Sequence, residues 1–354
     1  MRPTYVCLFA AFVVVLAACS GASAVETTTT TASTTTSSTS TTSTTRPPTT
    51  TTTIEPAPPV SPLNGLPADD PALLDRGVLA IKIDNHWNAR PQSGIQEADA
   101  MFELLVEAGL TRFISLFHTN DSDYLGPMRS GRPTDPTLLK PLEAIFSISG
   151  AQDWVIDKIV ESGVQIIGEV RPATFRISSR SAPHNLYVDT AQLREYGDRQ
   201  GYDSEPPADL FSWGDFEPME AAERITLRFS PETTVGWDWD GERYLRSING
   251  VESEWLNGDG ETGRISTDTL VVLFARRYTA SPPAGTGGTS VPAMDTVGSG
   301  RALVFAEGGV AEGTWERDDI DDMFELTDPN DEALIVPAGR PWISVLPDSR
   351  TVSW

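Results

Sequence analysis

The stretch VLAIKIDNHWNARPQSGIQEADAMFELLVEAGLTRFISLFH, residues 78–118, decides how the fold of this chain is predicted. Residues 78–83 form an apolar run with a single lysine, which is typical of a buried strand. Residues 112–118 alternate between apolar and polar positions, and this period of two also predicts a strand. Two strands so close in sequence indicate a sheet at the start of the folded body.

The residues between these strands, 100–106, are ambiguous. Their sequence AMFELLV alternates poorly, whereas Glu103 and Glu107 stand at the spacing of a helix. In a helix the two carboxylates would lie ~5–6 Å apart on one face, close to the separation that retaining glycosidases use. In a strand they would lie ~13 Å apart, and each would pair with an arginine. Both interpretations stay open.

Outward from this stretch, the first half alternates strands with helices and the second half is rich in strands, which predicts an α+β fold. We expect an N-terminal α/β domain with a mixed sheet and helices (61–200), an acidic connector (201–224) and a C-terminal β-rich domain (225–354). Further helices are expected at residues 134–143, 152–162 and 190–196. Further strands are expected at residues 144–149, 164–168, 225–229, 237–239, 243–248, 269–278, 301–306, 309–315 and 341–346, with hairpin turns at Asp240-Gly241 and Glu307-Gly308.

Composition excludes some classes of protein. The chain has 354 residues, 39% of them hydrophobic, which is enough for a folded core. It carries 50 Asp and Glu against 26 Lys and Arg, a net charge of −24. Such an acidic protein is repelled by bare DNA or RNA, so no nucleic-acid partner is expected.

The N-terminus predicts export and a lipid anchor. Residues 5–17 are an apolar run of 13 residues that is too short to cross a bilayer, which needs ~20, but suits a signal peptide (1–18). Leu16-Ala17-Ala18-Cys19 then matches a bacterial lipobox, so Cys19 is expected to carry acyl chains of the palmitate type and to anchor the protein outside the cytoplasm, on the cell membrane. The alternative is an ordinary signal peptide with an incidental cysteine.

After Cys19 the chain is expected to form a disordered tether (19–60). Residues 27–53 contain 18 Thr and 5 Ser, which cannot build a core, and their glycosylation stays open. The chain has two cysteines. Since Cys7 would leave with the signal peptide and Cys19 would carry lipid, no disulfide, thiol nucleophile or cysteine metal site is expected in the body.

Polar segments next to the predicted strands are the candidate ligand-binding site. A loop that follows the carboxyl end of a strand is where α/β proteins bind ligands, and arginines in Gly/Ser-rich loops hold carboxylate or phosphate groups. The alternatives are turns that satisfy their own backbone and arginines that neutralise carboxylates of this chain. The candidate ligand-binding residues are Asp84, Asn85, Arg90, Arg112, Arg129, Arg132, His184 and Asn185.

Other chemistries lack their signatures. The three histidines, His86, His118 and His184, have no HExxH or short H-x-H spacing, so no metal is expected. No G-x-S-x-G, Walker or G-x-G-x-x-G motif is present, and no cofactor is expected.

Several motifs together resemble the YerB-like family of bacterial lipoproteins, a family of unknown function. The resemblance covers residues 62–347 and rests on residues 62–67, 83–85, 89–94, 111–113, 126–133, 182–187, 244–250, 297–300, 302–305 and 312–315, together with Glu103 and Glu107. It implies a two-part α+β protein and favours a strand around Glu103, although Leu104-Leu105 departs from the family pattern and leaves that stretch open. It brings no reaction, cofactor or ligand.

Three functions follow as hypotheses. In the first, the protein binds a cell-envelope ligand that bears carboxylate or phosphate, and the segments 126–133 and 182–187 meet in space so that Arg129 and His184 share one site. In the second, it hydrolyses envelope glycan or peptide, with Glu103 or Glu107 as general acid or base and His184 in support. In the third, it is a structural envelope protein that contacts other proteins through its β-rich half.

Overall fold

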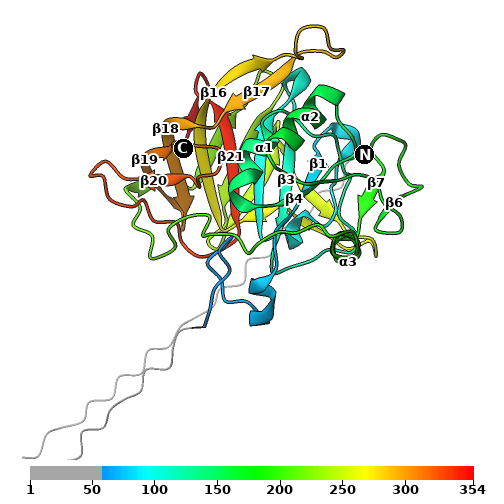
Figure 1. The fold of residues 1–354 in the computed structure, drawn as a ribbon. Coiled ribbons are helices and arrows are strands. Elements are labelled where there is room, and N and C mark those ends of the chain that lie inside the picture. Colours follow the sequence, from blue (N-terminus) through cyan, green and yellow to red (C-terminus); the bar gives the residue numbers. More distant parts are fainter. Residues whose placement is uncertain (1–57) are drawn as a thin grey trace, which may run out of the picture. The chain divides into compact units, whose positions relative to one another are not determined.

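The computed structural model describes residues 58–354 (Figure 1). The predicted signal peptide, Cys19 and nearly all of the tether lie outside the described residues. Within residues 58–354, no helix has the length and apolar character needed to cross a membrane.

A mixed sheet of twelve strands runs through the described body, with β2 and β21 as hydrogen-bonded neighbours near its centre. Its order is β20-β19-β18-β16-β21-β2-β3-β1-β4-β5, and β17 and β8 pair with β16 and β19. The strands are β1 (Leu79–Asp84), β2 (Ala100–Leu105), β3 (Thr111–Phe117), β4 (Ile145–Ser147), β5 (Ile166–Ile167), β8 (Glu220–Ala221), β16 (Thr269–Ala280), β17 (Val291–Asp295), β18 (Gly298–Ala306), β19 (Gly309–Arg317), β20 (Glu325–Thr327) and β21 (Pro341–Pro347).

The remaining strands form a second sheet and two small ribbons. The second sheet has the order β12-β11-β10-β9-β22, with β15 beside β11, and the ribbons are β13-β14 and β6-β7. These strands are β6 (Thr174–Arg176), β7 (Leu186–Val188), β9 (Arg224–Arg228), β10 (Thr234–Trp239), β11 (Tyr244–Ile248), β12 (Val251–Glu252), β13 (Glu254–Leu256), β14 (Thr262–Arg264), β15 (Ser266–Thr267) and β22 (Val352–Ser353).

Both faces of the central sheet pack against buried side chains. On one face Phe102 and Ile114 share a core with Ile159 of a helix, and on the other face Met101 packs in a core with Trp237 of the second sheet. The helices are α1 (Asp135–Leu139), α2 (Asp153–Glu161) and α3 (Thr190–Gln200), and short 3-10 helices span Pro71–Asp75, Trp87–Ala89, Ile95–Glu97, Glu107–Gly109 and Lys140–Leu142.

The structure settles the ambiguous stretch in favour of a strand. Every residue of β2 is buried, because the sheet is covered on both faces, and such a strand need not alternate in polarity. The Glu307-Gly308 hairpin turn is confirmed, with φ of 53° and 73° as a tight hairpin requires. The third helix runs beyond its predicted end at residue 196, to Gln200, where Gly201 with φ of 77° ends it.

The coarse fold class is confirmed: the described body is rich in strands, with a mixed sheet and few helices. Strands of both expected domains share the twelve-stranded sheet, since β2 and β21 pair in parallel. The connector also packs, because Leu210 and Phe211 are buried and β8 pairs with β19. The division into two domains at residues 201–224 stays a prediction.

A buried carboxylate joins the two sheets. The Glu103 side chain on β2 has an exposed fraction of 0% and pairs with Arg246 of β11 at 2.7 Å, which is 1% exposed. Its oxygens also accept hydrogen bonds from the Thr111 hydroxyl at 2.7 Å and from the Trp342 indole N–H at 3.0 Å. A buried charge is tolerated only when it is paired and hydrogen-bonded in this way.

The Glu103→Gln variant should therefore lose much stability. It leaves the buried Arg246 without its counter-charge, and breaking a buried pair costs about 3–5 kcal/mol. The matched control is Glu312→Gln, which breaks a half-exposed pair with Arg301 and should cost about 1 kcal/mol or less. Urea unfolding of the two variants measures the difference, and equal losses would show that Glu103 does not hold the sheets together.

Candidate functional site

Asp84, the last residue of β1, is the centre of the predicted ligand-binding residues. Its carboxylate is 3% exposed and its Oδ2 lies 2.7 Å from Nδ1 of His184 and 3.3 Å from Nε of Arg129. The other oxygen, Oδ1, accepts the backbone N–H of His86 at 3.0 Å. One carboxylate thus holds an imidazole and a guanidinium, and its second oxygen closes the local turn that was the alternative interpretation.

The predicted meeting of segments 126–133 and 182–187 is confirmed. The backbone N–H of Met128 donates to the carbonyl of Leu186 at 2.7 Å. Both segments also reach Asp84, one through its arginine and the other through its histidine. The guanidinium of Arg129 also donates to the Pro183 carbonyl at 3.4 Å, so main-chain and side-chain contacts together hold the two segments side by side.

A row of rings lies beside the carboxylate. The imidazoles of His86 and His184 stack with their ring centroids 4.7 Å apart. The ring centroids of Trp87 and His86 lie 3.7 Å apart. Trp87 is 64% exposed, an unusual position for a large aromatic residue. Burial, and then the neighbouring His184, lower the pKa of His86.

A buried network supports the loop after Asp84. Arg90 donates from Nε to the Asn85 side-chain oxygen at 3.0 Å, and the Gln92 amide reaches the same oxygen at 3.0 Å. The Asn85 amide donates to the Thr111 hydroxyl at 2.8 Å, and that hydroxyl bonds Glu103. The loop is therefore fixed to the buried carboxylate that joins the sheets. Burial lowers the pKa of Arg90 to about 10.

Two more predicted arginines lie together at the segment 126–133. Arg112 donates to the Ser130 carbonyl at 2.8 Å, and Arg132 pairs with Glu107 at 2.7 Å. Burial, and then the charge of Arg132, lower the pKa of Arg112 to about 10. The two guanidinium groups thus repel each other across a shared carbonyl, since Arg132 also donates to Ser130.

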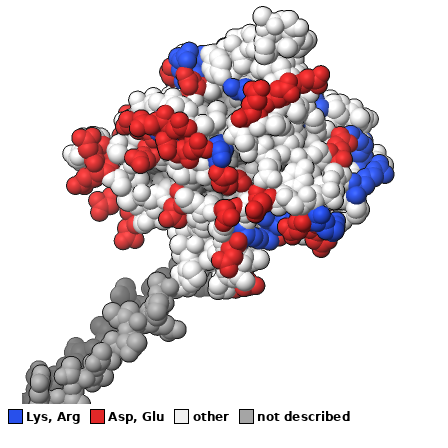
Figure 2. All heavy atoms as spheres, viewed as in Figure 1, with Lys and Arg blue, Asp and Glu red and all other residues white. Residues whose placement is uncertain are grey.

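The charge around Asp84 is opposite to that of the whole chain. Arg90 and Arg112 make no salt bridge with any carboxylate that the structure describes, whereas Arg129 and Arg132 pair with Asp84 and Glu107. Four arginines thus face two carboxylates in a chain of net charge −24. On the face that Figure 2 shows, acidic side chains gather over β18–β20, and Lys and Arg gather toward β6, β7 and α3.

Asn185 does not point at this cluster. Its amide donates to the carbonyls of Ile177 and Arg180, both at 3.2 Å, and its oxygen accepts from Arg176 at 2.9 Å. These contacts close the loop before β7. The polar atoms of Asn185 are thus engaged within its own loop, and its role in ligand binding stays a prediction.

The catalytic prediction for Glu103 and Glu107 finds no support in this geometry. Glu103 is wholly buried and both of its oxygens are occupied, so it has no path to a ligand. Glu107 follows β2 and pairs with Arg132. The carboxylate beside His184 is Asp84. Within residues 58–354, no three His, Cys, Asp or Glu side chains are grouped so as to hold a metal ion.

His86 and Trp87 also belong to the cluster, but the sequence did not predict them as ligand-binding residues. Both follow Asp84-Asn85 directly. The sequence signal was an aromatic residue in a polar loop after a buried strand, but the stacking on His184 comes from a segment about a hundred residues away.

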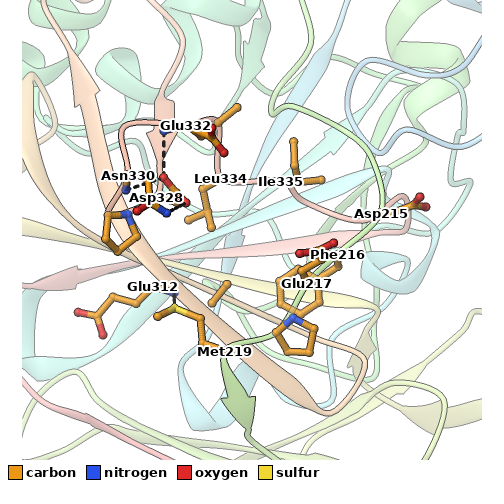
Figure 3. Close-up of a pocket in the computed structure, with 14 residues that line it drawn as sticks. Asp215, Phe216, Glu217, Met219, Glu312, Asp328, Asn330, Glu332, Leu334 and Ile335 are labelled. Atoms are coloured by element: carbon orange, nitrogen blue, oxygen red, sulfur yellow. Dashed lines mark hydrogen bonds between the residues drawn. The ribbon is translucent and has the colours of Figure 1, made fainter.

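A hollow of about 660 Å³ lies away from these residues, between the connector and the loop after β20 (Figure 3). The carboxylate of Asp328 accepts N–H groups of its own loop, and Glu312 pairs with Arg301. Among the residues that the structure describes, no lysine or arginine lines this hollow, so it does not suit an anion. Apart from the neutral amide of Asn330, its lining side chains are acidic or apolar, among them Asp215, Phe216, Glu217, Met219, Glu332, Leu334 and Ile335.

Comparison with protein families agrees with this structure. The family model described as "Protein of unknown function (DUF3048) N-terminal domain" matches residues 63–203, and the model of the DUF3048 C-terminal domain matches residues 225–343. The chain belongs to the DUF3048 family. The gap between the two DUF3048 matches coincides with the acidic connector.

A DUF3048 relative and a solved structure extend the comparison. The chain is 25% identical over 313 residues to "Putative lipoprotein YerB" of Bacillus subtilis (strain 168), covering 83% of this chain and 88% of that protein. The crystal structure of the YerB protein from Bacillus subtilis superposes with a TM-score of 0.70 at 22% identity, covering 83% of this chain and 99% of that one. The predicted resemblance is thereby confirmed, and this chain and the YerB protein share a fold.

The titration of His86 tests the geometry of the cluster. Because burial and the neighbouring His184 lower its pKa, we expect a midpoint below the ordinary value of about 6.5. The charge of Arg129 also lowers this pKa, so Arg129→Ala should raise it, and Arg199→Ala on α3 should not. Two-dimensional NMR of the imidazole protons measures the midpoint in both variants. An unchanged midpoint in Arg129→Ala would contradict the arrangement.

Proposed function

We propose that this protein is a lipid-anchored protein of the bacterial cell envelope that binds an oxyanion, a carboxylate or a phosphate, at the cluster around Asp84. The anchor is supported by the lipobox ending at Cys19 and by the name of the Bacillus relative. The single observation that carries the ligand is the local excess of arginine over carboxylate in a strongly acidic chain.

The chemistry of the cluster fits an oxyanion. Guanidinium groups present planar pairs of N–H donors that match carboxylate and phosphate oxygens. Arg112 has a backbone carbonyl as partner instead of a carboxylate, and its pKa is lowered by burial and by Arg132. A bound anion would relieve this repulsion, as a neighbouring negative charge favours the charged guanidinium.

The position of the cluster fits binding as well. The side chains of Arg129 and His184 are 21% and 12% exposed, so they are held by the protein but reachable from solvent. Trp87 adds an exposed flat surface next to them. Such a ring can lie against the apolar part of an anionic ligand.

The binding proposal predicts a loss of function without a loss of fold for Arg129→Ala. A partly exposed ion pair contributes about 1 kcal/mol or less, which for a body of this size is a fall of roughly 2–4 °C in melting temperature. Binding, in contrast, should weaken by about tenfold or more, because a charged hydrogen bond to the anion is lost. The control Arg199→Ala removes a 60% exposed arginine of α3 and should change neither property.

Calorimetric titration of the full chain with two probes separates the sources of the anion. A glycerol phosphate oligomer supplies phosphate, and a soluble peptidoglycan fragment supplies carboxylate. If either probe binds the unaltered chain and Arg129→Ala weakens that binding, the proposal is supported and the probe identifies the anion as phosphate or carboxylate. If neither probe binds the unaltered chain, or if the unaltered chain and Arg129→Ala bind equally well, the binding proposal is wrong. A large drop in the melting temperature of Arg129→Ala would mark this arginine as structural.

A second candidate, hydrolysis of an envelope polymer, is favoured by one contact. Oδ2 of Asp84 lies 2.7 Å from Nδ1 of His184, and a carboxylate that holds Nδ1 orients the imidazole so that Nε2 can act as a general base. Asp84 and His184 would then take the roles predicted for Glu103 and Glu107. New reducing ends or amines from cell-wall fragments, lost in His184→Ala, support this candidate, and their absence in the unaltered chain rules it out for those substrates.

A further inference from the structure

A second hollow, apart from the Asp84 cluster, gathers arginines around a tryptophan. It has a volume of about 360 Å³ and lies where the segment before β2 meets the β13–β14 ribbon and the loops before β11 and β21. Sites for small molecules typically measure ~300–1,000 Å³, so the hollow has the size of a small ligand. Neither the proposed function nor any predicted ligand-binding residue involves it.

Arginines dominate the lining of this hollow. Arg243, Arg264 and Arg340 line it, and Asp268 is its single carboxylate among the lining residues that the structure describes. Oδ2 of Asp268 accepts the backbone N–H of Arg340 at 2.7 Å. Outside the lining, the largely exposed carboxylates of Glu242 and Glu252 pair with Arg243 at 3.0 Å and with Arg264 at 2.8 Å. Burial lowers the pKa of Arg340 to about 10, and the charge of Arg243 acts in the same direction, so these two guanidinium groups lie close enough to repel each other.

Two buried polar atoms at this hollow have no hydrogen-bond partner within the described part of the chain. They are Nε of Arg264, a donor, and Oε1 of Gln96, an acceptor. The other atoms of these side chains are occupied. Arg264 donates to the Arg246 carbonyl at 3.0 Å and pairs with Glu252 at 2.8 Å, and the Gln96 amide donates to Asn257 at 2.6 Å and to Glu97 at 3.1 Å. Unpartnered buried polar atoms are rare in native proteins, so each calls for an explanation.

The tryptophan is held in place by its neighbour on the facing strand. Trp255 pairs with Gly263, and a Cβ atom added at that glycine would lie 2.5 Å from the indole ring. A side chain at Gly263 would therefore displace the ring. The ribbon is fixed to the rest of the body by the N–H of Leu256, which donates to the Gln92 carbonyl at 2.9 Å. The indole thus forms a fixed flat wall of the hollow.

We propose that this hollow binds an acidic sugar, that is, a sugar ring with a carboxylate or phosphate substituent. The arginines match the oxyanion, and the unpartnered Oε1 of Gln96 requires a donor, which a hydroxyl or amide group of a sugar provides. The indole of Trp255 offers the flat apolar surface on which a sugar ring can rest. A plain anion would leave Oε1 of Gln96 without a partner. A neutral sugar would bring no negative charge to Arg243 and Arg264, whose pairs with the largely exposed Glu242 and Glu252 are weak.

Three probes separate these requirements: N-acetylmuramic acid, which carries a carboxylate, N-acetylglucosamine 1-phosphate, and neutral N-acetylglucosamine. Each is titrated into the full chain while NMR follows the indole N–H of Trp255, assigned with Trp255→Phe. One or both acidic sugars should shift this signal, and the neutral sugar should bind at least tenfold more weakly. The stronger acidic probe identifies carboxylate or phosphate as the oxyanion.

The matched variants are Arg243→Ala and Arg224→Ala. The only side-chain hydrogen bond of Arg243 among the described residues goes to its neighbour Glu242, so its removal should not unfold the body. Arg224 is 85% exposed on the adjacent strand β9 and does not line the hollow. Arg243→Ala should weaken binding of the acidic sugar about tenfold, and Arg224→Ala should leave it unchanged. An unmoved Trp255 signal, equal binding of the neutral sugar, or equal loss in both variants would overturn the proposal.

Discussion

The burial of the Glu103 carboxylate is the constraint on which the rest of the structure depends. A charge with no exposed surface needs a counter-charge and hydrogen bonds from close range, and these come from three other strands through Thr111, Arg246 and Trp342. Those strands belong to both halves of the sequence and to both large sheets. Any other packing of the two sheets would leave this carboxylate or Arg246 unpaired, so the pair specifies how the halves fit together.

The same network fixes the geometry of the Asp84 cluster. The Thr111 hydroxyl donates to Glu103 and accepts from Asn85, whose own oxygen receives Arg90 and Gln92. Side chains that are locked by such supporting contacts hold a binding site more exactly than loop residues that face water. This arrangement explains why polar residues stand directly after a buried strand: Asn85 and Gln92 connect the cluster to the core.

The sequence predicted what local patterns determine. Periodicity placed the strands that begin at residues 79, 145 and 269, and turn chemistry placed the Glu307-Gly308 hairpin. It left residues 100–106 open, because a strand buried on both faces shows no alternation. In the candidate site, the sequence correctly grouped Asp84, Arg129 and His184, because each lies in a polar segment next to a predicted strand. Pairing of Glu103 with an arginine was the expectation for a strand, but its partner Arg246, 143 positions away, has no local signal, and so the catalytic alternative stayed open.

An acidic protein can still bind anions, because distance decides which charges matter. At physiological ionic strength charges separated by more than about 8 Å of solvent are largely screened, so the carboxylates gathered over β18–β20 act weakly on a ligand at a remote hollow. Partly buried guanidinium groups in direct contact with the ligand are screened much less. The net charge of −24 therefore governs solubility and encounters at long range, whereas the local balance around Asp84 and around Trp255 governs what can bind there. Composition alone argues against a nucleic-acid partner, but it carries no information on these two places.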